Sequence, residues 1–181
     1  GSRQDEINYI APRFIQAAKL IRHELPEAQF VVPAAGAARY AQLKNLLLQE
    51  HCPVQLKQGQ SHSCLAAADA VLVASGTATL ETALFKKPMV IAYAMPALSW
   101  HLMKNKGYLP WVGLPNILCK DFVVPELLQD RATPQALAEA ILKQLSDDSK
   151  RAALKERFSL LHTALKRDFA VTAARTVLEM L

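Results

Sequence analysis

The sequence predicts an α/β fold, with helices on both faces of one doubly wound parallel sheet. Two short apolar runs, Ala70–Ala74 and Met89–Tyr93, are nearly continuous, which is typical of parallel strands that are covered on both faces. Segments with apolar residues at helical spacing lie between such runs, so helix and strand alternate along the chain. The 181 residues are 51% hydrophobic, which suits one domain with a sizeable core.

The first third of the chain begins with a helix and then alternates. Apolar residues recur at helical spacing from 6 to 25, and Pro26 ends this predicted helix. Ser61 is a suitable N-cap for a short helix that reaches residue 68. The elements expected between these two helices are a strand at 30–33, a helix at 37–50 and a strand at 54–56.

The turn after the strand Ala70–Ala74 carries the first functional signal. Its residues are Ser75, Gly76 and Thr77, and a run of good helix formers follows. Ser75 or Thr77 can cap the first turn of that helix, and Gly76 lets the backbone bend or approach a ligand closely. The free N–H groups and the positive dipole end of the helix favour a phosphate. Glu81 lies one turn further along the same face, where its carboxylate could accept hydrogen bonds from a ribose.

A phosphate at the helix tip and a ribose one turn further along would make this a nucleotide site. An ordinary helix cap followed by a solvated glutamate fits the same spacing, because short patterns of this kind recur by chance. Spacing alone therefore favours the ordinary cap. The turn does lie where ligands of open parallel sheets bind, outside the carboxyl ends of the strands, but it is the family resemblance described below that gives preference to the nucleotide site.

The remainder of the chain is more helical. Pro88 stops the helix that follows the turn, and Thr133 with Pro134 begins a further helix that reaches residue 145. In the tail, one apolar stripe comprises Leu154, Phe158, Leu161 and Leu165. The other elements expected are a helix from 95 to about 107, an irregular apolar loop at 108–118, a short helix at 125–129, a polar turn at 146–149, and tail helices at 150–168 and 171–181.

Composition excludes several classes of function. The net charge of +5 suits an anionic ligand, but no basic block is interleaved with aromatic residues, so nucleic-acid binding is disfavoured. The three cysteines lack C-x-x-C spacing and the five histidines are scattered, so neither a disulfide framework nor a zinc cluster is expected. No apolar run approaches the ~20 residues of a transmembrane helix, and no signal peptide is expected. Membrane association would therefore depend on surface patches.

Four segments give the chain a resemblance to a known family. They are GSR-x-x-E-I at 1–7, SGTATLE at 75–81, KKPMVIAYAM at 86–95 and LPNIL at 114–118. With these segments the chain resembles the second half of the lipid-A-disaccharide synthases, which are glycosyltransferases of the two-domain GT-B type. The likeness is dense as far as about Asp130 and thinner in the helical tail. It implies a Rossmann-like nucleotide-sugar domain.

The resemblance implies roles for seven residues. Arg3 is expected beside the diphosphate of the donor, and Glu81 on its ribose. Asn116 is expected near the sugar nucleotide. The backbone cradle for the diphosphate is expected to consist of Ser75, Gly76, Thr77 and Ala78. Two of these assignments have plainer alternatives, because Arg3 could be a solvated cation and Asn116 could cap a turn.

The resemblance also implies the reaction. The donor is UDP-2,3-diacylglucosamine, the acceptor is 2,3-diacylglucosamine 1-phosphate, and a β-1′,6-linked disaccharide forms with inversion in lipid A biosynthesis. No metal and no cofactor are expected, since a helix tip and an arginine can neutralise the departing diphosphate. The general base of the family belongs to its first half, so no catalytic residue is expected in this chain, and the chain alone is expected to be inactive.

Organisation and partners follow from the same likeness. Residues 1–165 are expected to form the nucleotide-sugar domain, and 166–181 a C-terminal helix that packs back on it or on a partner. A strand is expected to precede Gly1, although Gly1-Ser2 also matches the scar of a cleaved tag. The expected setting is the cytoplasmic surface of the inner membrane of Gram-negative bacteria, with a possible homodimer through C-terminal elements and no nucleic acid.

Two other functions are compatible with the fold. Another GT-B enzyme, such as the lipid II-forming N-acetylglucosaminyltransferase or a UDP-N-acetylglucosamine 2-epimerase, would share a nucleotide-facing carboxylate. Those enzymes lack the joint occurrence of the segments at 1–7, 75–81 and 114–118. The second alternative is a non-catalytic nucleotide-binding module with a vestigial site.

Overall fold

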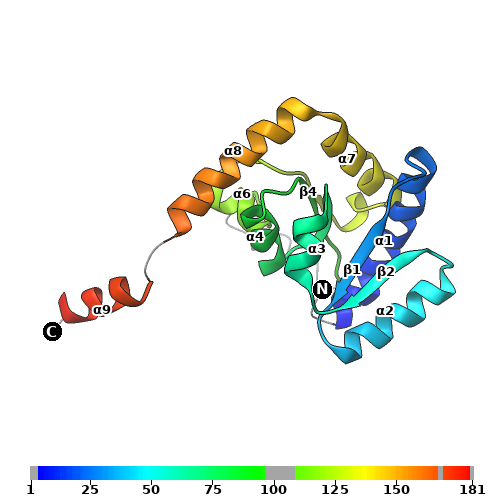
Figure 1. Cartoon of the computed structure of the whole chain (residues 1–181), viewed down its shortest axis with the longest axis horizontal. Coiled ribbons are helices and arrows are strands. Elements are labelled where there is room, and N and C mark those ends of the chain that lie inside the picture. The colour runs from blue at the N-terminus through cyan, green and yellow to red at the C-terminus, as the bar shows by residue number, and fades with distance from the viewer. Residues whose placement is uncertain (1–3, 97–108, 167–168, 180–181) are drawn as a thin grey trace.

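The computed structural model describes residues 4–96, 109–166 and 169–179, and Figure 1 shows their arrangement. Helices and strands alternate through the first half of the chain, and the second half is mainly helical. The elements in chain order are α1 (Gln4–Glu24), β1 (Phe30–Ala34), α2 (Ala37–Gln49), β2 (Val54–Gln58), α3 (Ser61–Ala67), β3 (Val71–Ala74), α4 (Thr77–Leu84), β4 (Met89–Tyr93), α6 (Leu114–Cys119), β5 (Glu126–Leu128), the 3-10 turn η1 (Gln129–Arg131), α7 (Pro134–Ser146), α8 (Asp148–Leu165) and α9 (Phe169–Glu179).

All strand pairs among the described residues are parallel, which confirms the predicted α/β class. The ladders fall into two groups, however. One sheet consists of β1 and β2, with Phe30 opposite Val54, and the other has the order β3-β4-β5, with Val71 opposite Met89. The single continuous sheet that the sequence predicts is therefore divided between β1 and β3.

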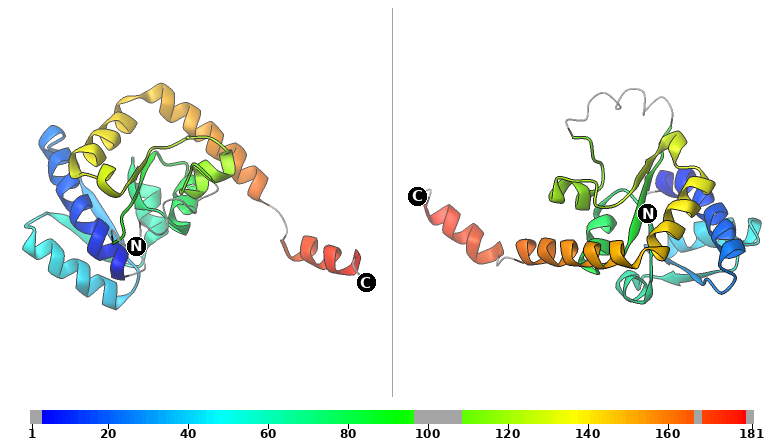
Figure 2. Two further views of the ribbon diagram at one scale, coloured as in Figure 1. Left: turned by 180° about the vertical axis from the view of Figure 1, so that it is seen from behind. Right: turned by 90° about the horizontal axis from the view of Figure 1, so that it is seen from above.

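Helices cover both faces of the three-stranded sheet, as Figures 1 and 2 show. Because side chains alternate along a strand, Val90 and Ala92 pack against α1 and α7. Met89 and Ile91 point to the other face and pack against α8, with Phe158 in the same cluster. Residues Met89 to Ala92 are 0% exposed, so β4 is the centre of the core.

α1 lies over both sheets. Its residues Ile10, Ala17 and Ile21 belong to the cluster that contains β4. Its first turns pack against the other sheet, since Ile7 shares a cluster with Ala34, the last residue of β1. The beginning of α1 therefore lies at the carboxyl edge of the strands, and the helix ties the two sheets together.

The structure also corrects predictions for individual elements. Residues 126–128 form a strand beside β4, because pairing with Ile91–Tyr93 outweighs the weak local preference for helix. Leu114–Cys119 is a helix with Pro115 in its first turn, where a loop was expected. At α3 the N-cap is Gln60, not Ser61, and no side chain caps the helix. The helix expected from 95 to about 107 lies mostly outside the described residues.

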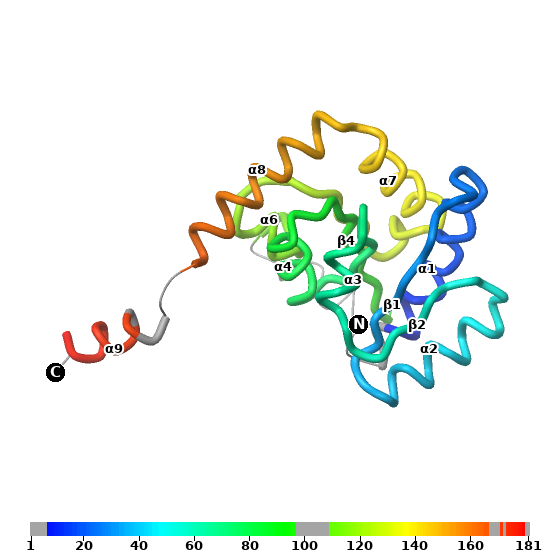
Figure 3. Tube along the Cα trace, in the orientation of Figure 1, coloured from blue at the N-terminus to red at the C-terminus, as the bar shows by residue number. Residues whose placement is uncertain are grey.

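The C-terminal helices differ in their packing. Thr133 caps α7 as predicted, because its side chain accepts a hydrogen bond from the Ala136 N–H at 3.1 Å. In α8 the residues Leu154, Phe158 and Leu161 are buried as the predicted stripe requires, but Leu165 is exposed. Figure 3 shows α9 projecting away from the rest of the described chain. No helix within the described ranges is long and apolar enough to cross a bilayer.

Candidate functional site

The candidate site is the turn from β3 into α4. The Ser75 N–H donates to the Ala92 carbonyl at 2.9 Å, so the ladder with β4 extends one residue beyond the strand. Gly76 then has φ 152° and ψ −166°, a conformation that residues with a side chain rarely adopt. A Cβ atom built on Gly76 would meet no atom within 4 Å, so glycine is needed for its backbone angle and not for space. No other part of the described chain therefore packs against the tip of α4 at Gly76.

The first turn of α4 leaves backbone donors available. Gly76, Thr77 and Ala78 are exposed, while Thr79 is buried and binds the Gly76 carbonyl through both its N–H (3.1 Å) and its hydroxyl (2.7 Å). Within the described residues, the N–H groups of Thr77 and Ala78 have no hydrogen-bond acceptor. Unpaired N–H groups at the positive end of a helix dipole can bind an anion such as a phosphate.

The predicted side-chain cap is wrong. Gly76 occupies the N-cap position, and no side chain accepts a hydrogen bond there. The Ser75 hydroxyl instead donates to the Val112 carbonyl at 3.1 Å. One of the two residues expected to cap the helix, Ser75, therefore anchors the loop before α6, and the other, Thr77, does not cap it either.

Glu81 lies one turn beyond the tip and faces α3. Its side chain is 42% exposed, and its Oε2 lies 3.7 Å from Nε2 of His62 in the first turn of α3. The His62 ring also contacts the Phe85 ring, with centroids 5.5 Å apart. An exposed pair at this distance contributes little to stability. The Glu81 carboxylate is accessible to a ligand because much of its side chain is exposed. His62 has no signal in the sequence, because only the packing of α3 beside α4 brings it to Glu81.

A second element of the site is the loop that contains Val112 and Gly113. The carboxylate of Glu126 on β5 accepts hydrogen bonds from both of their N–H groups at 2.9 Å. Glu126 also accepts a hydrogen bond from the Asn116 side-chain amide at 2.8 Å. Sequence reasoning missed this residue, because it assigned 125–129 to a helix and a single acidic residue in an apolar segment gives no local signal.

Asn116 is 0% exposed, and its side chain links α6 to the segment at the start of β5. Its Nδ2 donates to the Val124 carbonyl at 2.9 Å, and its Oδ1 accepts from the Val124 N–H at 3.0 Å. Both polar atoms of its side chain therefore have partners within the protein. The contact between Asn116 and a sugar nucleotide stays a prediction, and the geometry favours an action through the loop that Ser75 also holds.

Of the predicted site residues, five lie together on the turn and the first two turns of α4, and Asn116 is linked to them through the loop. The five are Ser75, Gly76, Thr77, Ala78 and Glu81. Arg3 lies outside the described residues. No group of three or more His, Cys, Asp or Glu side chains in the described ranges could hold a metal ion.

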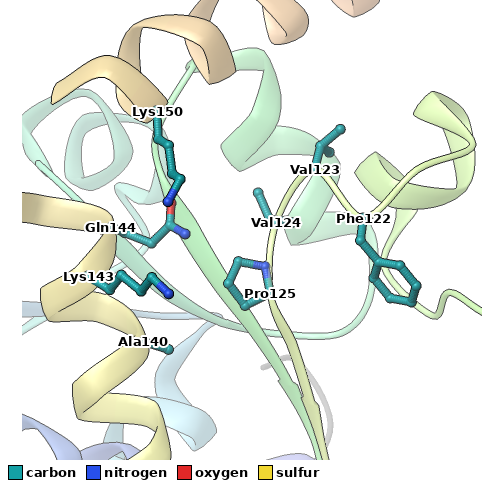
Figure 4. Close-up of a pocket in the computed structure, with 8 residues that line it drawn as sticks. All are labelled: Phe122, Val123, Val124, Pro125, Ala140, Lys143, Gln144 and Lys150. Carbon is teal, nitrogen blue, oxygen red and sulfur yellow. The ribbon is translucent and has the colours of Figure 1, made fainter. Parts of the chain in front are cut away.

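A separate hollow lies away from this site, and Figure 4 shows it. It is formed by the residues before β5, the second half of α7 and the beginning of α8. Since residues 122–125 precede β5, this hollow lies at the amino end of that strand, at the opposite edge of the sheet from Ser75. Its lining residues are Phe122, Val123, Val124, Pro125, Ala140, Lys143, Gln144 and Lys150.

Comparison with known proteins gives a consistent result. Residues 1–179 match the family described as lipid-A-disaccharide synthetase. The chain is similar to the lipid-A-disaccharide synthases of Albidiferax ferrireducens (54% identity over 100% of the chain and 48% of that protein) and Chromobacterium violaceum (49% over 99% and 47%). That of Paraburkholderia xenovorans is 50% identical over 98% of the chain and 46% of the relative. The chain thus spans about half the length of the curated relatives that it matches.

Proposed function

Because the chain belongs to the lipid-A-disaccharide synthetase family, we propose that it is the UDP-sugar-binding half of a lipid-A-disaccharide synthase. Family membership assigns it to lipid A biosynthesis and to a group of glycosyltransferases. The observation that carries the finer proposal is the open tip of α4 with the accessible carboxylate of Glu81 one turn beyond it.

The spacing of these groups fits a nucleoside diphosphate. The N–H groups of Thr77 and Ala78 would bind the diphosphate oxygens, helped by the dipole of α4. Along an α-helix, one turn corresponds to ~5.4 Å. A ribose attached to the phosphate would therefore reach Glu81, whose carboxylate would accept hydrogen bonds from the ribose hydroxyls.

The role of this half in the reaction is to stabilise the leaving group. In an inverting transfer the acceptor hydroxyl oxygen bonds to the anomeric carbon of 2,3-diacylglucosamine while the bond from that carbon to the UDP oxygen breaks. Negative charge develops on the departing diphosphate, and fixed N–H groups aimed at it lower the barrier. Arg3 is proposed to add a positive charge there, with no metal ion required.

The proton of the acceptor hydroxyl must pass to a general base. By likeness to the family, that base lies in the other half of the enzyme. We therefore expect this chain alone to bind UDP weakly and to form no disaccharide. Detection of disaccharide from UDP-2,3-diacylglucosamine and 2,3-diacylglucosamine 1-phosphate with the purified chain would contradict this division of roles.

The proposed setting is the cytoplasmic face of the inner membrane of a Gram-negative bacterium, because both substrates carry acyl chains. Attachment there would be peripheral and would rely on surface patches. A homodimer through C-terminal elements is part of the proposal and has its own test below. The family match disfavours the lipid II-forming transferase and the 2-epimerase as alternatives.

Calorimetric titration with UDP tests the proposal. The native chain should release heat, and Glu81→Ala should bind about 10- to 100-fold more weakly, because hydrogen bonds to a charged group contribute ~1.5–3 kcal/mol. A matched control is Glu139→Ala, which removes an exposed glutamate of α7 and should leave UDP binding unchanged. Equal affinity of the native chain and Glu81→Ala would displace Glu81 from the site. Absence of UDP binding to the native chain would contradict the proposed nucleotide site.

A further inference from the structure

α3 and α4 begin in the same way. Two residues separate β2 from α3, and two separate β3 from α4. The first turn of each helix therefore lies beside the carboxyl end of its strand, which is where ligands of open parallel sheets bind. Figure 1 shows the two helices side by side, and a contact between His62 of α3 and Glu81 of α4 joins them.

The His62 ring lies across one face of α4. Glu81 and Phe85 are four residues apart on that helix, so their side chains lie on the same face. The His62 ring contacts the half-buried Phe85 ring, with centroids 5.5 Å apart and an interplanar angle of 46°. Its Nε2 atom lies 3.7 Å from Oε2 of Glu81. The aromatic contact thus holds the imidazole in a place where one nitrogen is directed to the carboxylate.

Stability does not account for this pair. The His62 side chain is 73% exposed, and α3 contains no buried residue. An exposed pair of this kind contributes little to folding. The distance also exceeds that of a direct hydrogen bond, but contacts in a binding site are often long without a ligand and shorten when it binds. The pair is therefore suited to act on a ligand of Glu81.

The Glu81 carboxylate has little else to orient it. Within the described ranges, His62 is the only group that pairs with this carboxylate. A glutamate side chain loses rotamer freedom when it binds a ligand, and that loss lowers the affinity. A neighbour that already restricts the carboxylate in the free protein reduces this loss. His62 is placed to have that effect.

We propose that His62 is a positioning residue for the nucleotide. Its Nε2–H donates to Oε2 of Glu81, which leaves Oε1 to accept hydrogen bonds from the ribose hydroxyls. A neutral imidazole has one donor and one acceptor nitrogen, and a carboxylate beside Nε2 favours the tautomer with the proton there. Because His62 acts through Glu81, it affects recognition of the ribose and not of the diphosphate. This inference rests on the proposed function, since it requires Glu81 to bind the ribose.

Titration of the chain with UDP and with 2′-deoxy-UDP, followed by NMR, tests the proposal. The two ligands have the same base and diphosphate and differ only in the 2′-hydroxyl. Affinities are read from the amide signals of Thr77 and Ala78. The native chain should bind UDP about 10-fold more tightly than 2′-deoxy-UDP, because a hydrogen bond to a charged group is lost with the hydroxyl. In His62→Ala this preference should fall to about 3-fold or less, with the affinity for 2′-deoxy-UDP nearly unchanged.

Two further variants separate positioning from a general effect. His62→Gln keeps a hydrogen-bond donor at the start of α3 and should retain more of the preference for UDP than His62→Ala does. The matched control is His23→Ala, because His23 on α1 is also an exposed histidine beside a glutamate, with Nδ1 3.2 Å from Oε1 of Glu24. This control should leave both affinities unchanged.

The ratio of the two affinities distinguishes the outcomes. A preference in His62→Ala as large as in the native chain would overturn the proposal. An equal loss of affinity for both ligands would also overturn it, since His62 would then support the site as a whole. If His62→Gln shows no greater preference than His62→Ala, a hydrogen-bond donor is not what His62 provides, and the proposal is equally overturned.

The native chain shows separately whether the proposed function holds. Equal binding of UDP and 2′-deoxy-UDP by the native chain would overturn this inference together with the ribose contact of Glu81, but would leave the diphosphate site at the tip of α4. Absence of UDP binding would contradict the nucleotide site itself and this inference with it. Loss of the preference in His62→Ala alone is the result that supports both.

Discussion

At the scale of single residues, Gly113 illustrates how closely the loop before α6 approaches the core. A Cβ atom at this position would overlap Cδ1 of Ile91 and lie 3.1 Å from Oε1 of Glu126. The backbone angle of Gly113 is ordinary (φ −88°), so any constraint on a side chain here comes from the space that Ile91 occupies. The close approach lets the Gly113 N–H reach Glu126, and this holds the loop beside Ser75.

We predict that Gly113→Ala lowers the free energy of unfolding by about 1–3 kcal/mol, because it overpacks a buried contact. Urea denaturation of the two proteins measures the difference.

Ile91→Val provides the matched control, since it removes the Cδ1 atom that the new methyl group would meet. Alone it should cost about 0.5–1.5 kcal/mol. In the double variant the penalty of Gly113→Ala should be smaller than in the native background. An unchanged penalty would show that Ile91 is not the cause.

At the scale of elements, α8 packs against the three-stranded sheet through one of its faces. Phe158 is 0% exposed and packs in the cluster of Met89 and Ile91, whereas Leu160, two residues on, is 64% exposed. The helix therefore offers two large apolar residues with opposite environments.

We predict that Phe158→Ala lowers the free energy of unfolding by about 3–5 kcal/mol, because it leaves a cavity behind the sheet. Leu160→Ala on the same helix should change it by no more than ~0.5 kcal/mol. Thermal and urea unfolding of both variants provide the measurement. Similar losses in the two variants would mean that α8 does not pack as described.

The beginning of α8 carries a charge-dependent cap. The pKa of Asp147 is lowered, mainly because its carboxylate accepts a hydrogen bond from the Lys150 N–H, at 2.9 Å, and also because it pairs with the Lys150 side chain. A carboxyl group with a lowered pKa in the folded state stabilises that state above its unfolded pKa, and the contribution is lost as pH falls through the folded pKa.

Asp147→Asn keeps a good N-cap but removes the charge. We predict that the native chain is more stable than this variant at pH 7. The difference should disappear as the pH falls from the pKa of Asp147 in the unfolded state, ~3.9, through its lower pKa in the folded state. Urea midpoints of both proteins measured from pH 7 to pH 3 test this expectation. A difference that is the same at pH 3 and pH 7 would rule out the charge as its source.

At the scale of the whole molecule, apolar surface gathers on the helices that project from the body. Leu160 and Leu165 on α8 and Val177 and Leu178 on α9 are exposed, and Leu178 is 71% exposed. Figures 1 and 3 show that α9 extends away from the sheets. An exposed apolar helix face favours association with a partner or with a second copy. The predicted boundary at 165 falls at the end of α8 and stays a prediction.

We predict that the chain self-associates, with an average mass by light scattering that rises with concentration. Leu178→Glu should reduce this rise, because it places a charge on the apolar face. Lys44→Gln changes the net charge by the same amount at an exposed position of α2 and should leave the rise unchanged. A concentration-independent monomeric mass for the native chain would contradict the prediction.

The sequence by itself determined the features that depend on local patterns. The apolar runs at 71–74 and 89–93, the glycine turn at Gly76 and the capped start of α7 were all predictable, because periodicity, backbone freedom and capping act over a few neighbouring residues. The α/β class followed from the alternation of these elements. Five of the proposed site residues lie together for the same reason, since they are consecutive or one helical turn apart.

Only the tertiary structure decided which distant groups meet. The strand at 126–128 exists because it pairs with β4. Its Glu126 has a structural role because three donors, two from the loop before α6 and one from α6 itself, converge on its carboxylate. His62 beside Glu81 and the unpaired edges of β1 and β3 likewise have no local signal. Such contacts depend on how helices and strands pack against one another, and the free energy of that packing is not contained in any one segment.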